Sequence, residues 1–251
     1  MAKAAPAVKG SNSREVLKVQ VAACTRLLNM AGILHYSGHL SARVPGTDTI
    51  YIQTRTESRA DVSPDSLLLV DLDGNVIEGK GKPPSELCIH TGIYKARPDA
   101  GAVIHNHMEL AAAFTMVKDV KLQCMSFHAV RWADGIPVMR EAGKFKTEEH
   151  GRALAKAIGK HNALLLRAHG IVLVSEGPTA ILSDTMHFED NAKQQKEALQ
   201  LSRNLDPIDQ SELARVHEYE DRDHHIRKMW NYYVGEGVKK GAIPEGWDAK
   251  Y

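Results

Sequence analysis

The sequence predicts an α/β protein in which helices lie on both sides of a central sheet. Two observations support this fold class. Short apolar stretches with strand character recur along the chain, and segments with helical periodicity stand between and after them. The chain has 251 residues, 43% of them hydrophobic and 25% charged, so it can bury the core of one large domain.

The first third of the chain is expected to hold one helix and four short strands. The helix runs from Ser13 to Met30 and stops at Gly32, and residues 1–12 before it are predicted to form a flexible tail. The Asp73-Gly74 turn signal joins the last two strands. The expected strands are Leu40–Val44, Thr49–Gln53, Leu67–Asp71 and Val76–Ile77.

The middle of the chain alternates between the two kinds of element. A helix is expected after Pro83-Pro84 and before Pro98, with Ser85 as its N-cap and Glu86 in the first turn, where the helix dipole favours an ionised carboxylate. The elements expected after it are a strand Ala102–Asn106, a helix Glu109–Met116, a strand near Gln123, a helix Thr147–Ile158 and two strands through His169 and Val174.

Two long helices are predicted in the last third, Pro178–Leu201 and Gln210–Val234. Their length suits a contact between subunits or a lid over an active site. The aromatic residues of the second helix, Trp230, Tyr232 and Tyr233, are expected to serve packing or subunit contact.

Charge and cysteine content exclude several functional classes. The formal net charge is +1 and the basic residues are spread among the acids, so no footprint for nucleic acid is present. Cys24, Cys88 and Cys124 stand far apart in apolar contexts, which indicates buried thiols in a reducing cytoplasm. No apolar run approaches the roughly 20 residues that span a bilayer. We therefore expect a cytoplasmic protein without nucleic-acid or membrane partners.

Four residues have the pattern of a divalent-metal site. His105 and His107 are two residues apart at the end of a predicted strand, so both rings lie on one face. A second apolar run ends in His169, just before a glycine. Three neutral imidazoles with an open position are typical of a catalytic transition-metal site, with Glu86 as a mobile carboxylate beside it. A histidine pair alone often arises by chance among 13 histidines, so the second strand and Glu86 carry the interpretation.

Five motifs together resemble the class II aldolase/adducin family between about Arg14 and Ser202. They are Ser37-Gly38-His39-Leu40-Ser41-Ala42-Arg43, Pro84-Ser85-Glu86, Arg97-Pro98-Asp99-Ala100, His105-Asn106-His107 and Ala168-His169-Gly170. The resemblance implies a three-layer α/β/α sandwich around a mostly antiparallel sheet. It further implies a family domain over residues 13–202, a helical C-terminal extension over residues 203–251, and a homotetramer with active sites between subunits.

The same resemblance implies roles for the four residues. His105, His107 and His169 would bind the ion, and Glu86 would be the catalytic acid/base that also touches it. Zinc is the usual metal, and manganese, magnesium, cobalt or iron serve in some members.

Several positions differ from the sugar-phosphate aldolases of this family, which hold phosphate with an Asn, a Thr-Gly pair and a Ser-Ser pair. His39, Arg55-Thr56 and Pro84 stand at these positions here, so we expect the phosphate site to be lost. Arg55 is predicted to bind a substrate carboxylate with His39 and Ser85, since a guanidinium forks well onto a carboxylate. The alternative for Arg55 is an ordinary surface arginine.

His128 is the predicted proton donor. The aldolases supply a tyrosine to the neighbouring subunit's site from this region, and residues 125–128 contain none. The competing interpretation is a buried histidine with a structural role.

The sequence therefore predicts a metal-dependent carbon–carbon lyase. The favoured reaction is decarboxylation of a hydroxylated aromatic or semialdehyde carboxylic acid through a metal-stabilised enolate, as in aromatic compound catabolism. The first alternative is an aldolase acting on a non-phosphorylated hydroxy or oxo acid. A non-catalytic adducin-like module and an iron-dependent oxygenase are further alternatives, and the ligand histidines weigh against the module.

Overall fold

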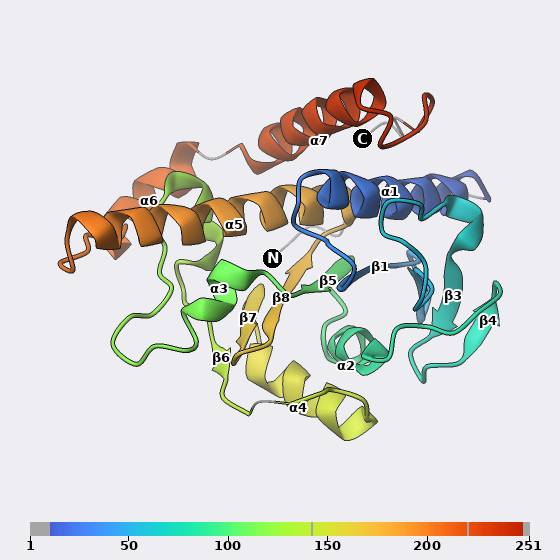
Figure 1. Ribbon diagram of the computed structural model, residues 1–251, viewed down its shortest axis with the longest axis horizontal. Helices are drawn as coiled ribbons and strands as arrows, with labels where there is room; N and C mark the ends of the chain where they lie inside the picture. Colours follow the sequence, from blue (N-terminus) through green and yellow to red (C-terminus); the bar gives the residue numbers. More distant parts are fainter. Residues whose placement is uncertain (1–10, 142, 220, 248–251) are drawn as a thin grey trace.

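The computed structural model describes residues 11–141, 143–219 and 221–247. A central eight-stranded sheet lies between two layers of helices, as Figure 1 shows. This arrangement confirms the expected three-layer α/β/α architecture. Residues 1–10 of the predicted tail lie outside the described residues, and helix α1 begins at Ser11.

The strands form one sheet in the order β4-β3-β2-β1-β5-β8-β7-β6. Their bounds are β1 His39–Arg43, β2 Thr49–Ile52, β3 Leu68–Asp71, β4 Val76–Glu78, β5 Ala102–Asn106, β6 Val138–Met139, β7 Ala163–Leu166 and β8 Gly170–Ser175. Neighbouring described strands run antiparallel, except that β6 and β7 are parallel. The sheet is therefore mostly antiparallel, and β5 lies near its centre between β1 and β8.

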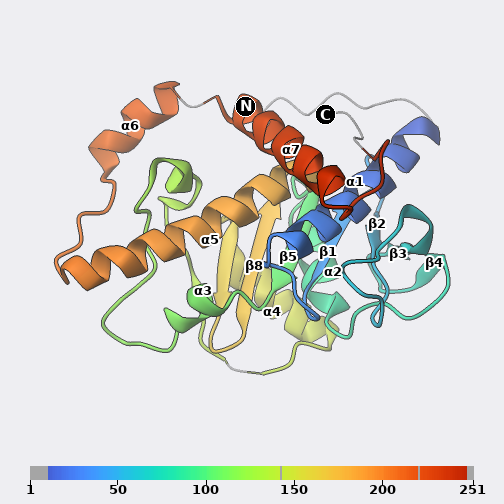
Figure 2. The same ribbon diagram turned by 45° about the horizontal axis from the view of Figure 1, so that its top comes forward.

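Helices cover both faces of this sheet. Their bounds are α1 Ser11–Met30, α2 Leu87–Ala96, α3 Glu109–Ala113, α4 Glu148–Ile158, α5 Pro178–Leu201, α6 Gln210–Tyr219 and α7 Arg222–Lys239. Figures 1 and 2 show α1 and α5 on one face, α2 and α4 on the other, and α7 outside α1 and α5. Along β5, Ile104 packs into one apolar core and Val103 into the other, which is the alternation of a strand buried on both faces.

The predicted strand near Gln123 is wrong. The backbone N–H of Gln123 donates to the side-chain oxygen of Gln195 at 2.8 Å, and its carbonyl accepts from Asn191 at 2.8 Å. Both amide side chains project from α5. They satisfy the backbone groups that a neighbouring strand would otherwise pair, so this segment follows the helix without joining the sheet.

The predicted helix Gln210–Val234 is two helices, α6 and α7. The side chain of Asp221 accepts a hydrogen bond from the backbone N–H of His224 at 3.0 Å and caps the start of α7. An N-cap inside the stretch starts a new helix there. The predicted helix Pro178–Leu201 is confirmed as α5. The helix predicted over Glu109–Met116 is α3, which ends at Ala113.

A buried carboxylate ties α7 to α5. Asp184 of α5 is 2% exposed, and its Oδ1 lies 2.8 Å from Nη1 of Arg222 on α7. Nε of Arg131 is 3.0 Å from its Oδ2, and the hydroxyl of Ser175 donates to the same oxygen. Arg222 also pairs with Glu176 at 2.7 Å. This network holds α7 against α5.

The cysteines are expected to be inert in the native protein. Cys24, Cys88 and Cys124 are free and buried, and burial raises the pKa of the Cys88 and Cys124 thiols to about 11. Since the thiolate is the reactive form, a thiol reagent at pH 8 should label less than one cysteine per chain within minutes and all three in guanidinium. Rapid native labelling of two or more thiols would contradict this burial.

No described helix has the length and apolar content needed to cross a membrane.

Candidate metal centre

Four side chains from three separate segments meet beside the central strands. Glu86, His105, His107 and His169 each offer one ligand atom, and these atoms lie within 4.8 Å of one another. Oε2 of Glu86 is 3.6 Å from Nε2 of His105, and its Oε1 is 3.6 Å from Nε2 of His169. The chain thus brings together the residues that sequence analysis assigned to one site.

The central position of β5 fixes His105. The residue is fully buried and pairs across the sheet with His39 of β1 and Val172 of β8. Its Nδ1 lies 2.8 Å from the carbonyl oxygen of Ile171. A carbonyl only accepts hydrogen bonds, so Nδ1 carries the proton and the lone pair of Nε2 is directed toward the cluster.

His169 lies in the turn between β7 and β8 rather than in a strand. Ala168 before it has φ 53, in the left-handed region that non-glycine residues rarely adopt. A Cβ on Gly170 after it would lie 2.1 Å from the backbone oxygen of Asn106, so glycine allows this turn to approach the end of β5. Phe145 stacks on the His169 ring at a centroid distance of 5.6 Å and an angle of 5°.

The donor set fits a divalent transition metal. Glu86 Oε1, His105 Nε2 and His107 Nε2 are buried and have no hydrogen-bond partner among the described residues. Buried polar atoms normally have partners, and a cluster of such atoms on imidazole and carboxylate groups is what a metal ion would satisfy. Imidazole nitrogens suit zinc, manganese, cobalt and iron, so the donor set alone does not select one.

Burial and mutual attraction set the charges in this cluster. Burial on its own raises the pKa of Glu86, but the electrostatic effect of His105, followed by that of His169, outweighs it and holds the pKa at about 2. Burial, then the neighbouring histidine charges, lowers the pKa of His107 to about 4. Near neutral pH the cluster therefore holds an ionised Glu86 and a neutral His107. These are the forms in which both groups bind a cation.

A second layer of side chains lies behind Glu86. His39 Nε2 is 4.0 Å from Glu86 Oε2, and its Nδ1 is 2.6 Å from Nε2 of His90 on α2. His90 Nδ1 in turn is 2.6 Å from the hydroxyl of Ser41. Sequence analysis missed His90, although its position four residues after Glu86 on one helix places the two on the same face.

The predicted substrate-binding residues lie near the start of α2. Arg55 is exposed, and its Nε donates to the carbonyl of Pro83 at 3.1 Å, three residues before Glu86. Ser85 is exposed and does not cap the helix, because Glu86 occupies the N-cap position and makes no side-chain capping bond. That N-cap prediction was wrong. Arg59, four residues after Arg55, is buried, with 6% of its surface exposed.

His128 packs away from the four ligands of its own chain. The residue is exposed, and its ring stacks on His187 of α5 at a centroid distance of 4.5 Å and an angle of 7°. Its ring also lies 5.1 Å from that of His225 on α7. The proton-donor role of His128 stays a prediction, and it requires a neighbouring copy of the chain.

A cavity of about 260 Å³ adjoins the cluster. Its walls include His107 and His169 together with His35, Tyr36 and Glu109. Tyr36 is 92% exposed, which is unusual for an aromatic side chain and leaves its ring available at the cavity mouth. None of these three wall residues stood out in the sequence, because they belong to a loop and a short helix without a recognisable motif.

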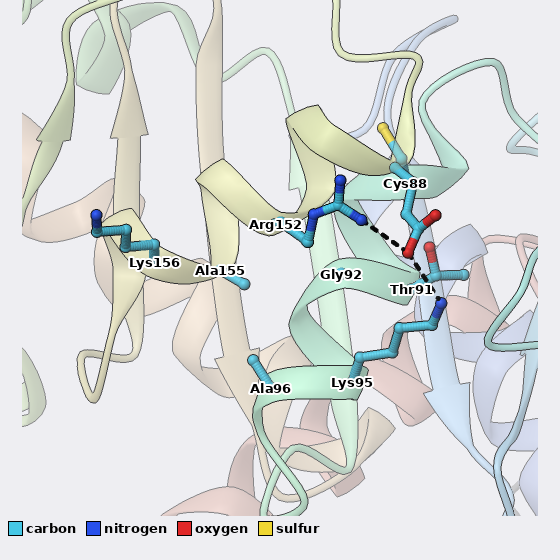
Figure 3. Close-up of a pocket in the computed structure, with 9 residues that line it drawn as sticks. Cys88, Thr91, Gly92, Lys95, Ala96, Arg152, Ala155 and Lys156 are labelled. Atoms are coloured by element: carbon cyan, nitrogen blue, oxygen red, sulfur yellow. Dashed lines mark ion pairs between the residues drawn. The ribbon is translucent and has the colours of Figure 1, made fainter.

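A larger cavity lies elsewhere, between α2 and α4, as Figure 3 shows. Its charged residues are Lys95, Glu148, Arg152 and Lys156. Glu148 pairs with Arg152 at 3.0 Å and with Lys95 at 3.6 Å, so it offsets one of the three positive charges in the cavity wall. It contains none of the four clustered donors, and we assign it no catalytic role.

The chain resembles several known proteins. Residues 19–196 match the model of the Class II Aldolase and Adducin N-terminal domain. The chain is 25% identical over 230 residues to L-ribulose-5-phosphate 4-epimerase of Salmonella paratyphi B. The aligned region covers 88% of this chain and 98% of the epimerase.

Two solved structures of L-fuculose 1-phosphate aldolases also resemble the chain. The Glaciozyma antarctica enzyme has a TM-score of 0.80 at 20% identity, covering 95% of each chain. The Thermus thermophilus enzyme has a TM-score of 0.63 at 26% identity, covering 77% of this chain and 100% of the other.

Proposed function

Because the chain belongs to the family of class II aldolases and adducin N-terminal domains, we propose that it is a divalent-metal-dependent carbon–carbon lyase. One observation carries the proposal: the ligand atoms of Glu86, His105, His107 and His169 converge within 4.8 Å. Three imidazole ligands leave a coordination position for a substrate. Zinc is the ion we favour, with manganese, magnesium, cobalt and iron as alternatives.

The bound ion and Glu86 have different roles in the proposed reaction. A bound divalent ion supplies Lewis-acid stabilisation of negative charge on substrate oxygens. Glu86 is ionised in the resting protein, where His105 and His169 hold its pKa down. When a substrate separates it from these histidines, the remaining effect of burial raises its pKa, which suits a group that carries a proton to or from the reacting carbon.

Decarboxylation of a hydroxylated aromatic or semialdehyde carboxylic acid is the reaction we favour. The bond to the carboxylate carbon breaks, its electron pair stays on the ring or chain carbon, carbon dioxide leaves and that carbon takes up one proton. The exposed ring of Tyr36 beside His107 and His169 supports a planar substrate, since aromatic rings stack. Arg55 and His39 supply donors for its carboxylate on the Glu86 side.

Aldol cleavage or epimerisation is the second candidate. The observation that favours it is the 25% identity to the ribulose-phosphate epimerase and the 26% identity to the Thermus thermophilus aldolase. The same ion would stabilise the negative charge left when an aldehyde departs. His39 and Pro84 occupy the positions of small phosphate donors, so we propose a non-phosphorylated hydroxy or oxo acid for this reaction.

Product analysis separates the two candidates. Metal-reconstituted protein is incubated with a panel of ortho-hydroxylated aromatic carboxylates and with non-phosphorylated hydroxy acids. Release of carbon dioxide that a chelator abolishes supports the decarboxylase. An aldehyde product without carbon dioxide supports the aldolase, and no turnover with any of the metals would contradict both.

Replacing Arg55 tests the carboxylate anchor. We expect Arg55→Ala to raise KM for the acid substrate about 10- to 100-fold with a smaller change in kcat, since a hydrogen bond to a charged group contributes about 1.5–3 kcal/mol. Arg203→Ala, which removes an exposed arginine beyond the end of α5, should leave both constants unchanged. An unchanged KM in Arg55→Ala would show that Arg55 is an ordinary surface residue.

We also propose that the active protein is a homotetramer. His128 packs on His187 and His225 rather than on its own chain's metal ligands, so a catalytic role for it needs a site completed by a neighbouring copy. Light scattering of the purified protein measures the number of chains directly, and a monomer with full activity would remove His128 from the mechanism.

A further inference from the structure

Three histidine rings from separate elements meet where α7 joins α5. His128 belongs to the short 3₁₀ helix Phe127–Trp132, His187 to α5 and His225 to α7. The rings of His128 and His187 are stacked at a centroid distance of 4.5 Å and an angle of 7°, and the ring of His225 lies 5.1 Å from that of His128. We call these three residues the histidine group.

A layer of charged side chains lies one helical turn from the histidine group. In each of the three elements, a charged residue is three positions from the histidine: Arg131 in the 3₁₀ helix, Asp184 in α5 and Arg222 in α7. Residues at this spacing lie on the same face of a helix. Both arginines contact Asp184, at 3.0 and 2.8 Å, and both contact Glu176, at 3.0 and 2.7 Å. Two adjacent layers, one charged and one of imidazoles, therefore join the same three elements.

The formal charges of the charged layer already cancel, because two arginines face two carboxylates. Asp184 is 2% exposed, and guanidinium groups contact both of its oxygens. The hydroxyl of Ser175 donates to one of these oxygens as well. A proton on His187 would add a positive charge beside this layer, and the Asp184 carboxylate that attracts it is already shared by two arginines.

The surroundings of His187 favour its neutral form. Burial has the largest effect on its pKa and lowers it, followed by the charge of His128. His225 and Arg222 on α7 act in the same direction, whereas Asp184 on α5 raises the pKa. The resulting pKa is about 4, below the value of about 6.5 for a histidine in water.

Detachment of α7 would therefore take up protons over a defined pH range. A His187 released into water has a pKa near 6.5 and the packed one a pKa of about 4, so the detached form binds more protons between these values. The attachment has its full stability above about pH 6.5 and weakens as the pH falls toward about 4. Helix α7 lies outside residues 19–196, which match the family model, so its release does not require the family domain to unfold.

We propose that the histidine group is a pH-sensitive attachment of α7: the neutral rings hold α7 against α5, and their protonation releases α7 from an otherwise folded domain. Neutral rings pack closely, whereas imidazolium groups at these distances repel one another and the adjacent arginines. This attachment does not depend on the proposed lyase activity, and none of its histidines is among the four candidate metal ligands.

Hydrogen exchange of the full-length protein, zinc-loaded and metal-free, tests the attachment. Amide protection in α7 and in β2 is measured at about pH 7.5 and about pH 5, with correction for the effect of pH on the chemical exchange rate. A pKa change from 6.5 to about 4 at one histidine should lower the protection of α7 about 30-fold at the lower pH. The β2 amides should stay more protected than those of α7. Unchanged protection of α7 at the lower pH would overturn the proposal.

His187→Gln separates the histidine group from other effects of acid. Its amide is neutral at every pH, so the protection of α7 should match the wild type at about pH 7.5 and fall less than about 3-fold at about pH 5. His224→Gln, which alters an exposed histidine on α7, should lose protection as the wild type does. A His187→Gln protein that loses as much protection as the wild type would also overturn the proposal. If His187→Gln does not fold, His225→Gln decides the question: it should reduce the loss, and an undiminished loss would contradict the proposed attachment.

Discussion

His105→Ala is expected to abolish metal-dependent activity. His105 is fully buried, its Nε2 has no hydrogen-bond partner among the described residues, and its Nδ1 proton is fixed by the carbonyl of Ile171. Loss of an outer partner of a metal ligand typically costs about 10- to 100-fold in affinity, so loss of the ligand itself should weaken binding by more than about 100-fold. Equilibrium dialysis against zinc measures this change.

Thermal denaturation gives an independent reading of the same variant. An ion that binds only the folded state stabilises it by roughly 4 kcal/mol at a concentration 1,000 times its Kd. Zinc should therefore raise the melting temperature of the wild-type protein and leave that of His105→Ala unchanged. His224→Ala, which alters an exposed histidine on α7, should behave as the wild type. Equal zinc stabilisation of His105→Ala would place the ion elsewhere.

Of the substitutions proposed for this protein, Arg222→Ala should lower the free energy of unfolding most. Its guanidinium lies 2.8 Å from the buried carboxylate of Asp184 and 2.7 Å from the exposed carboxylate of Glu176. Removal of one partner leaves a buried charge incompletely compensated, which costs about 3–5 kcal/mol. Denaturant unfolding should show a decrease in the free energy of unfolding of this size, because α7 loses its ion pairs with α5 and Glu176.

Lys239→Ala on the same helix is the matched control. Its ammonium is 3.4 Å from Glu236, but the side chain is 76% exposed. An exposed pair of this kind contributes less than about 1 kcal/mol, so the variant should unfold nearly as the wild type does. If the two substitutions cost equal amounts, the Asp184 network does not hold α7 in place.

Local patterns were sufficient to predict most of the fold. The β-branched run before His105 predicts strand β5, and the segment before Leu87 predicts the start of α2, so the positions of His105 and Glu86 follow from the sequence. The other strands and α5 follow the expected periodicity. The strand near Gln123 failed because its backbone bonds come from amide side chains more than 60 residues away, at positions 191 and 195. Such bonds leave no periodic signal.

His39 was predicted as a site residue, but its contact with His90 was beyond sequence reasoning for a similar reason. His39 and His90 are 51 residues apart, and their 2.6 Å contact exists because the start of β1 lies beside the buried face of α2. The four-residue spacing of Glu86 and His90 predicts that both lie on the same face of one helix. Nothing in the sequence shows that β1 places His39 next to both of them. The cavity wall at Tyr36 depends in the same way on how a loop packs against β5.

Anomalous diffraction at the zinc edge, from crystals of the zinc-loaded protein, tests the central claim most directly. A second group of neighbouring histidine rings, His128, His187 and His225, serves as an internal comparison. We predict one peak per chain, within bonding distance of His105, His107 and His169 and beside Glu86. No peak at these residues, or a peak at the second group instead, would contradict the assignment of this site as the metal centre.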